Sequence, residues 1–285
     1  MPEGVNVSKR YKIGWFSTGR GEGSKGMLRA AQEAIKAGEL KAEIEFVFCA
    51  RERGETEPTD RYLDMVKEYG IPLVSFSYQK YRAMRGMPNP DLNAPLPQWR
   101  TDYDKEVLKL LKKFKPNLVL LAGLMIVTSP LMCNKYKIIN LHPAAPGGPA
   151  GTWQQVIWKL IEIKAEIQGI KMHVAIPELD MGPTATYCAF PLRGKAFDRL
   201  WEEIKGKTVE EIKATQGVEN ALFKTIRAHG AVRELPLIVS TLRVFSEGKI
   251  KITKDRQVVD AAGQVIKGYD LTEEIDEAVK GKLPE

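Results

Sequence analysis

Residues 11–40 read YKIGWFSTGRGEGSKGMLRAAQEAIKAGEL and set the pattern that most of the chain repeats. The stretch begins with an apolar run at 11–17, passes through a glycine-rich segment, and continues from residue 27 in a helical pattern that ends near Gly38. An apolar run, a glycine-rich turn and a helix in this order predict the start of a βαβ unit.

The same alternation continues along the chain. Further strands are predicted at 43–49, 71–75, 117–122 and 137–141, with helices at 59–69 and 102–114 between them. A helix at 152–165 and two strands at 169–176 and 183–190 follow, and their spacing favours an antiparallel extension. The pattern predicts an α/β, Rossmann-like fold: a mostly parallel central sheet with helices on both faces and an antiparallel C-terminal extension.

The remaining segments are expected to surround this sheet. Residues 78–99, rich in Pro, Asn and Met, are predicted to form a long loop, and residues 196–229 to form polar helices. Another helix is predicted at 231–246, ending at Gly248. The tail from 249 on carries a small hairpin and a short acidic helix. Without repeats or linkers, we expect a principal domain at 1–250 and a C-terminal appendage at 251–285.

Composition points to an ordinary globular protein. The chain has 285 residues, of which 44% are hydrophobic and 28% charged. No apolar run approaches the roughly 18–20 residues of a membrane span, and the N-terminus lacks a signal-peptide core. Cys49, Cys133 and Cys188 are too few and too scattered for a disulfide framework or a zinc site. We expect a cytoplasmic protein that binds no membrane and no metal.

The net charge of +7 suits anionic partners. The lysines and arginines are interleaved with glutamates, as in KGKTVEEIKATQ, which is typical of solvated helix faces. No nucleic-acid-binding module is recognisable. We therefore expect small-molecule substrates and no nucleic acid, and a homodimer is left open.

Residues 21–26, GEGSKG, form a literal G-x-G-x-x-G between a strand and a helix. Backbone N–H groups at a helix N-terminus favour an anion, so the loop can hold a phosphate. It also fits a dinucleotide fingerprint, since Glu43 or Glu45 follows about twenty residues on, and this alternative would make the chain an NAD-binding oxidoreductase. A tight turn with no ligand is the third interpretation. Lys25 and Arg20 favour phosphate.

Asn140-Leu141-His142 ends the strand predicted at 137–141. Residues two apart in a strand point to the same face, and ligands of open parallel sheets bind at the carboxyl ends of the strands. The amide of Asn140 can donate to an oxygen that gains negative charge, and the imidazole of His142 can move protons near neutral pH. The alternative is an ordinary core histidine.

Glu178-Leu179-Asp180-Met181-Gly182-Pro183 is the third cluster. An acid in such a turn can orient or charge-balance an imidazole, although turns of this composition are also common without a function. His173, in the preceding alternating strand, is more typical of a structural histidine.

Together these clusters resemble the folate-dependent formyltransferases. The matching motifs are Asn140 to Pro143, Gly169 to Val174 with His173, and Glu178 to Pro183, preceded by Ala122-Gly123-Leu124-Met125. The resemblance covers roughly residues 11–250. It implies the formyltransferase version of the Rossmann-like fold and the transfer of a formyl group from the co-substrate 10-formyltetrahydrofolate to an amine, without a metal.

The resemblance also implies roles for individual residues. Asn140, His142 and Asp180 correspond to the catalytic set, with His173 in support. The expected folate-binding residues are Leu124, Met125, Ile126, Val127, Glu178, Leu179 and Met181. Residues that match the branch acting on glycinamide ribonucleotide in purine biosynthesis, by holding its phosphate or ribose, are Gly21, Gly23, Ser24, Lys25, Arg100 and Glu234.

Several positions depart from the family pattern. Lys25 stands where an asparagine is usual, Ile126 stands where an arginine is frequent, and the segment 144–153 replaces a usual Ser-Leu-Leu-Pro. The acceptor therefore stays open between glycinamide ribonucleotide and another amine such as a sugar nucleotide. Hydrolysis of formyltetrahydrofolate and a non-catalytic binding role are further alternatives. Formylation of methionyl-tRNA is disfavoured, because the tail is short for the β-barrel of that branch.

Overall fold

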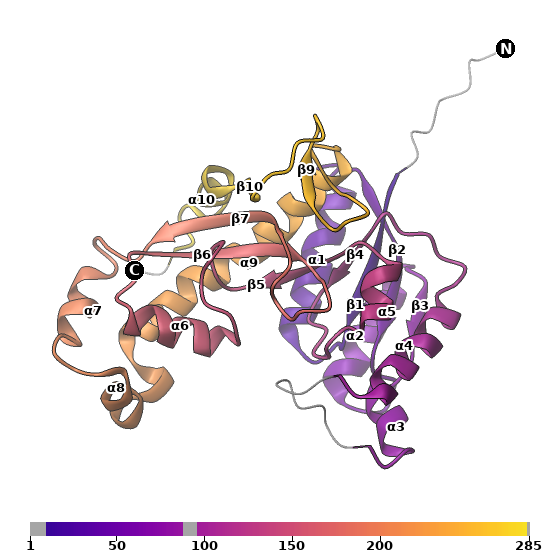
Figure 1. Ribbon diagram of the computed structural model, residues 1–285, viewed down its shortest axis with the longest axis horizontal. Helices are drawn as coiled ribbons and strands as arrows, with labels where there is room; N and C mark the ends of the chain where they lie inside the picture. The colour runs from indigo at the N-terminus through magenta and orange to yellow at the C-terminus, as the bar shows by residue number, and fades with distance from the viewer. Residues whose placement is uncertain (1–9, 88–95, 284–285) are drawn as a thin grey trace. The chain divides into compact units, whose positions relative to one another are not determined.

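The computed structural model describes residues 10–87 and 96–283. The chain divides into two compact units, residues 1–138 and residues 139–285. Figure 1 shows the helices and strands of both units. Residues 88–95 of the predicted loop lie outside the described residues.

The first unit is built on four parallel strands in the order β4-β1-β2-β3. They are β1 (Tyr11–Ser17), β2 (Ala42–Cys49), β3 (Leu73–Ser75) and β4 (Leu118–Leu121). All four residues of β4 and the last five of β1 are buried. Nearly continuous apolar runs of this kind are typical of parallel strands covered on both faces.

Helices of the first unit cover both faces of these strands. They are α1 (Glu22–Lys36), α2 (Glu57–Glu68), α3 (Tyr78–Ala83), α4 (Gln98–Leu110) and α5 (Pro130–Lys135). Right-handed crossovers place α1 and α2 on one face, and the return from β3 to β4 places α4 on the other. In agreement, α1 packs on α2 and α4 packs on α5 (Figure 1). The predicted Rossmann-like α/β arrangement is confirmed.

Several boundaries in the first unit differ from the prediction, including that of α4, which begins at Gln98 rather than at residue 102. Helix α1 begins at Glu22 rather than at residue 27, so residues 22–26 of the glycine motif lie inside the helix. Helix α3 lies inside the segment predicted as a loop. Ser77 caps it by accepting a hydrogen bond from the backbone N–H of Lys80 at 3.0 Å, and Tyr81 packs edge-on against Phe76. Aromatic packing thus outweighs the polar local pattern.

Strands of the second unit follow the order β10-β7-β6-β5. Their bounds are β5 (Ile138–His142), β6 (Ile167–Val174), β7 (Thr184–Pro191) and β10 (Tyr269–Asp270). Strand β6 is antiparallel to both β5 and β7, whereas β10 pairs with β7 in parallel. The predicted antiparallel extension is confirmed, and most strand pairs of the two units are parallel.

The second unit also holds the remaining helices and a hairpin. They are α6 (Trp153–Glu162), α7 (Asp198–Glu203), α8 (Val209–Thr215), the 3₁₀ turn η1 (Gly217–Glu219), α9 (Ala221–Ser246), α10 (Thr272–Val279), and the strands β8 (Ile250–Ile252) and β9 (Val258–Asp260). Helix α9 begins well before residue 231, where the prediction placed its start. Asn220 caps it by accepting from the backbone N–H of Phe223 at 3.0 Å, and Leu222 and Phe223 bury its first turn.

The C-terminal tail packs on the second unit. Helix α10 contacts α9 and β7, and Asp276 of α10 accepts a hydrogen bond from the buried Arg233 of α9 at 2.9 Å. The predicted hairpin and short acidic helix are both present, as β8–β9 and α10. The domain boundary expected at residue 250 stays a prediction.

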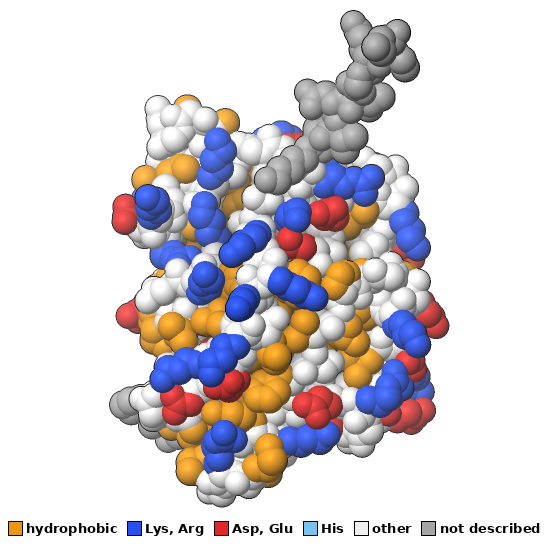
Figure 2. Space-filling view, turned by 90° about the vertical axis from the view of Figure 1, so that its right-hand side faces the viewer, with side chains coloured by type: hydrophobic (Ala, Val, Ile, Leu, Met, Phe, Trp, Pro, Cys, Tyr) orange, Lys and Arg blue, Asp and Glu red, His pale blue; other side chains and the backbone are white. Residues whose placement is uncertain are grey.

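Charges on the surface of the first unit are interleaved, as the sequence predicts. Exposed ion pairs join Arg53 to Asp64, Lys105 to Asp102 at 2.8 Å, and other neighbours on α2 and α4. Figure 2 shows basic side chains dispersed among acidic and apolar ones on one face of the molecule. Within residues 10–87 and 96–283, no helix combines the length and apolarity that crossing a membrane takes.

Candidate active site

The polar cluster at the end of β5 is shared with the neighbouring strand β6. In the antiparallel register Asn140 lies opposite His173, and His142 lies opposite Lys171. Directly opposed residues of antiparallel strands project to the same face, so these four side chains form one group. His142, His173 and Lys171 are buried, with 3%, 2% and 8% of their surfaces exposed.

Asp180 lies between the two imidazoles of this group. One carboxylate oxygen, Oδ2, is 3.7 Å from Nδ1 of His142, and the other, Oδ1, is 3.5 Å from Nε2 of His173. The two rings are nearly perpendicular, with centroids 6.1 Å apart. The structure thus brings together Asn140, His142, His173 and Asp180, all from the second unit.

The turn that contains Asp180 packs closely against the end of β6, where the backbone N–H of Val174 donates to the carbonyl of Pro183 at 2.9 Å. Asp180 adopts a left-handed backbone conformation with φ of 59°, which aspartate tolerates better than most residues. The backbone N–H of Met181 donates to the carbonyl of Glu178 at 3.2 Å. A Cβ atom on Gly182 would lie 1.7 Å from the carbonyl oxygen of Val174, so only glycine fits there.

The hydrogen bonds of His142 define where its proton can go. Nε2 lies 3.0 Å from the carbonyl oxygen of Pro149, and because a carbonyl can only accept, Nε2 carries a hydrogen. The neutral ring then has its lone pair at Nδ1, which faces Asp180. A proton added at Nδ1 gives an imidazolium held by the Pro149 carbonyl and the carboxylate.

His173 is arranged to stay neutral. Its Nδ1 lies 3.2 Å from the carbonyl oxygen of Val174 and therefore carries the hydrogen, so Nε2 can accept a long hydrogen bond of 3.5 Å from Nδ2 of Asn140. Burial lowers the pKa of His173 to about 4, Asp180 opposes this shift, and Lys171 and His142 lower the pKa further. The second N–H of the Asn140 amide is then available to a substrate oxygen.

The loop after His142, residues 143–151, is held against β6. Nε2 of Gln168 donates to the carbonyl of Pro143 at 2.9 Å. A Cβ atom on Gly169 would lie 2.9 Å from Cα of Ala145, so glycine at this position permits the close approach of the loop. This loop, which departs from the family pattern, thereby places the Pro149 carbonyl within hydrogen-bond distance of His142.

Two functional groups of this site were absent from the sequence prediction: Lys171 and the Pro149 carbonyl. Lys171 carries a signal, since Gly169, Lys171 and His173 alternate with apolar residues, and period two places them on one face. No sequence pattern predicts the role of the Pro149 carbonyl, because its position depends on the path of the loop.

The apolar residues of the Asp180 turn are exposed. Leu179 and Met181 have 50% and 71% of their surfaces accessible and flank the carboxylate-bearing residue. Exposed apolar side chains beside polar groups suit the aromatic part of an organic ligand. Their contact with folate, and that of Glu178, stays a prediction.

In the first unit the glycine motif forms the N-terminus of α1. Gly21 is its N-cap residue, and Gly23, Ser24 and Lys25 lie in the first turn. Lys25 is paired with Glu22 at 2.5 Å, and its side chain is only 12% exposed. First-turn N–H groups favour anions, and the assignment of these residues to phosphate stays a prediction.

The segment after β4 lies close to this helix within the first unit. A Cβ atom on Gly123 would lie 2.7 Å from Oγ of Ser24, and the carbonyl of Gly123 accepts from Oγ1 of Thr18 at 2.6 Å. Of the folate-binding residues predicted next, Leu124, Ile126 and Val127 are partly buried and Met125 is 66% exposed. Their role stays a prediction.

Arg100 and Glu234 are each engaged within their own unit. Arg100 is 1% exposed and donates to Oδ1 of Asp104 at 2.6 Å, while Oδ2 of Asp104 accepts from the backbone N–H of Ser129. This network joins α4 to the start of α5. Glu234 pairs with Arg227, whose guanidinium lies over the ring of Trp153. Contact of Arg100 with phosphate and of Glu234 with ribose stays a prediction.

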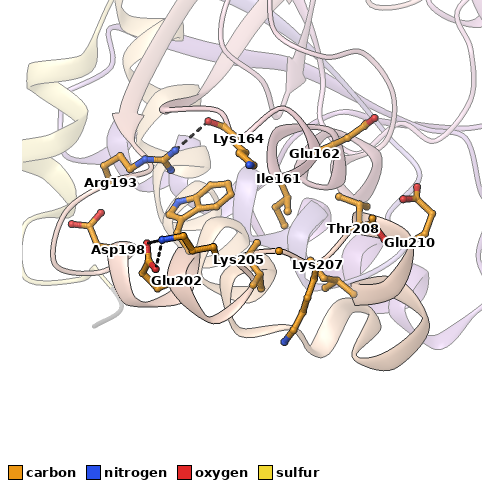
Figure 3. A pocket seen from close by; sticks show the side chains of 15 residues that line it. Ile161, Glu162, Lys164, Arg193, Asp198, Glu202, Lys205, Lys207, Thr208 and Glu210 are labelled. Carbon is orange, nitrogen blue, oxygen red and sulfur yellow. Dashed lines mark hydrogen bonds and ion pairs between the residues drawn. The ribbon is translucent and has the colours of Figure 1, made fainter.

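A cavity of about 700 Å³ lies elsewhere in the second unit. Residues from α6, α7 and α8 line it together with Lys164 and Arg193 from the segments that follow α6 and β7. Figure 3 shows how Ile161, Lys164 and Arg193 lie in it. None of the predicted site residues is among them. The described residues that line it include carboxylates and lysines but no histidine, so we place the candidate active site at the Asn140–Asp180 cluster, where two buried imidazoles meet a carboxylate.

The site combines a carboxylate between two imidazoles with an amide at the end of a strand. Such groups can stabilise an oxyanion and move a proton, as an enzyme that transfers a chemical group requires. Residues 21–192, more than half of the chain, match the formyl transferase family, and the chain therefore belongs to this family. The resemblance found in the sequence is confirmed, and the protein is a formyltransferase. The match includes the whole of residues 21–26, so the NAD-dependent alternative finds no support.

Two curated relatives are phosphoribosylglycinamide formyltransferases. The protein from Escherichia coli is 26% identical over 61% of this chain and 70% of its own length. The protein from Schizosaccharomyces pombe is 32% identical over 44% of this chain, and the match spans 56% of the relative.

Solved structures share the fold. The phosphoribosylglycinamide formyltransferase of Coxiella burnetii superposes with a TM-score of 0.62 at 19% identity, covering 92% of this chain and 99% of that one. A formyltetrahydrofolate deformylase from Burkholderia mallei gives a TM-score of 0.55 at 15% identity, covering 88% and 70%. At this identity the likeness concerns the fold, and the matched structures include both a formyltransferase and a deformylase.

Proposed function

We propose that the protein transfers the formyl group of 10-formyltetrahydrofolate to the primary amine of glycinamide ribonucleotide. The observation that carries the proposal is the position of the Asp180 carboxylate, 3.7 Å from His142 and 3.5 Å from His173, beside the Asn140 amide. The two curated relatives, which are phosphoribosylglycinamide formyltransferases, support the choice of acceptor.

The reaction makes one C–N bond and breaks another. The acceptor amine attacks the formyl carbon, the carbonyl oxygen becomes an oxyanion, and the bond to N10 of the folate then breaks. The second N–H of Asn140 donates to the oxyanion, and the positive charge of a protonated His142, whose own N–H groups face Pro149 and Asp180, favours it. The amine gives up one proton and N10 takes one, and His142 with Asp180 forms an acid–base pair that can carry a proton between them.

The test is a formyl-transfer assay with the full chain. We expect 10-formyltetrahydrofolate to be consumed, and formylated ribonucleotide and tetrahydrofolate to form in equal amounts, when glycinamide ribonucleotide is present. Mass spectrometry of the acceptor and absorbance of the folate measure both products. Parallel reactions contain an amino sugar nucleotide or no acceptor.

Each alternative gives its own result in this assay. Consumption of the formyl donor at the same rate with and without acceptor, with release of formate, would identify a hydrolase. Product only with the sugar nucleotide would retain formyl transfer and replace the acceptor.

A further inference from the structure

Lys171 is a buried lysine on the same sheet face as Asn140, His142 and His173. It lies opposite His142 on β5 and opposite Tyr187 on β7, and it shares its face of β6 with His173. Only 8% of its surface is exposed. Burial lowers the pKa of Lys171, and the Asp180 carboxylate opposes that shift. Lysine is rarely buried to this degree without a role for its charge.

Two imidazoles compete for the carboxylate of Asp180. If His173 took a proton at Nε2, that nitrogen would donate to Asp180 and could no longer accept from Asn140. The Asn140 amide would then lose the contact that orients it. The site therefore depends on His173 staying neutral while His142 takes the proton.

Charges facing His173 come from three elements. Asp180 in the turn favours the protonated ring, and Lys171 on β6 and His142 on β5 oppose it. His142 carries a charge only when it is protonated. Of Asp180, Lys171 and His142, Lys171 is therefore the residue that supplies a positive charge whether or not His142 is protonated. Tyr187 on β7 is neutral, and its hydroxyl donates to Asp270. Helix α9 packs through Thr241 on the opposite face of the strands, where Arg233 is paired with Asp276.

We propose that Lys171 is a positioning residue of the formyl-transfer site: its positive charge adds to burial in keeping His173 neutral, so that Nε2 of His173 orients the Asn140 amide and the mobile proton resides on His142. Its catalytic consequence rests on the proposed function, whereas its effect on His173 does not. Lys171 acts through His173 and is not assigned a contact with substrate.

The test is the titration of His173 by NMR of ¹⁵N-histidine-labelled protein, which is tractable because the chain has three histidines. His173→Gln identifies the resonance. In the unchanged protein His173 should stay neutral down to about pH 4. Lys171→Met and Lys171→Gln should shift its midpoint to higher pH, while Lys171→Arg should retain the original midpoint. Lys159→Met on the exposed face of α6 is the control and should shift nothing.

Activity gives the second readout. The acid limb of the kcat profile should move to higher pH in Lys171→Met, and Lys171→Arg should restore the profile. An unmoved His173 midpoint in both the Met and Gln variants would overturn the proposal. If no acceptor is formylated, the proposed function fails, yet the NMR titration still decides whether Lys171 controls His173.

Discussion

The two regions of this chain for which we predict anion binding, the Asp180 cluster and the N-terminus of α1, are constructed in different ways. At the Asp180 cluster, the proposed function depends on side chains whose tautomers are fixed by hydrogen bonds. His142 donates to the carbonyl of Pro149, and His173 donates to the carbonyl of Val174. At the N-terminus of α1 the groups that face an anion are backbone N–H groups, which nearly any sequence can supply. Side-chain changes should therefore damage the first region far more than the second.

The largest effect is expected from the cluster itself. Replacing Asn140 or His142 by alanine should lower kcat by about 10²–10³-fold, since each removes a group that stabilises the oxyanion. Asp180→Asn is the better probe of the carboxylate, because asparagine also tolerates the left-handed backbone at this position. Steady-state kinetics measures the loss, and circular dichroism should show an unchanged fold. A fully active His142→Ala protein would refute the mechanism.

Next in size is the turn that holds Asp180. Gly182→Ala places a Cβ atom against the carbonyl of Val174, so we expect a loss of about 1–3 kcal/mol in the free energy of unfolding and a parallel loss of kcat. Gly230→Ala is the matched control. Its Cβ would meet no atom within 4 Å, and alanine favours a helix, so this variant should be slightly more stable. Urea denaturation measures both, and equal stability of the two variants would contradict the steric argument.

A third effect concerns pH. The pKa of His173 is about 4 in the folded protein, below the ordinary value of 6.5, so the unfolded state binds more protons between these values. Stability should therefore fall as pH drops from about 6.5 towards 4, by on the order of 2–3 kcal/mol from this residue. His173→Gln should flatten the slope of unfolding free energy against pH. A variant with the same slope as the unchanged protein would show that His173 is not the group responsible.

The smallest effect is expected in the first unit. Lys25→Met should raise the KM for glycinamide ribonucleotide only about fivefold, because a cation near a helix N-terminus adds on the order of 1 kcal/mol to what the backbone supplies. Lys36→Met at the other end of α1 is the control. A hundredfold rise in KM for Lys25→Met would show that side chains dominate here too and would remove the contrast between the regions.

Features with a strong local sequence signal could be predicted, whereas features set by packing or by long-range contacts could not. Strands such as β4 were predictable because continuous apolar runs leave few alternatives, and Asn140 and His142 were predictable because period two fixes their common face. The early starts of α1 and α9 were not, since a glycine cap and the cap at Asn220 are weak local signals beside the packing that extends these helices. The role of Pro149 depends on a contact across the loop that no local pattern encodes.

The hydrogen bond from His142 to Pro149 has a consequence for the timing of the reaction. Rotating the imidazole by half a turn would put carbon atoms where Nε2 and Nδ1 now meet Pro149 and Asp180, so both contacts would be lost. The ring must therefore keep one orientation throughout a catalytic cycle. In the proposed reaction the proton taken from the acceptor amine and the proton given to N10 would then pass through the same atom, Nδ1, so the two transfers have to occur one after the other.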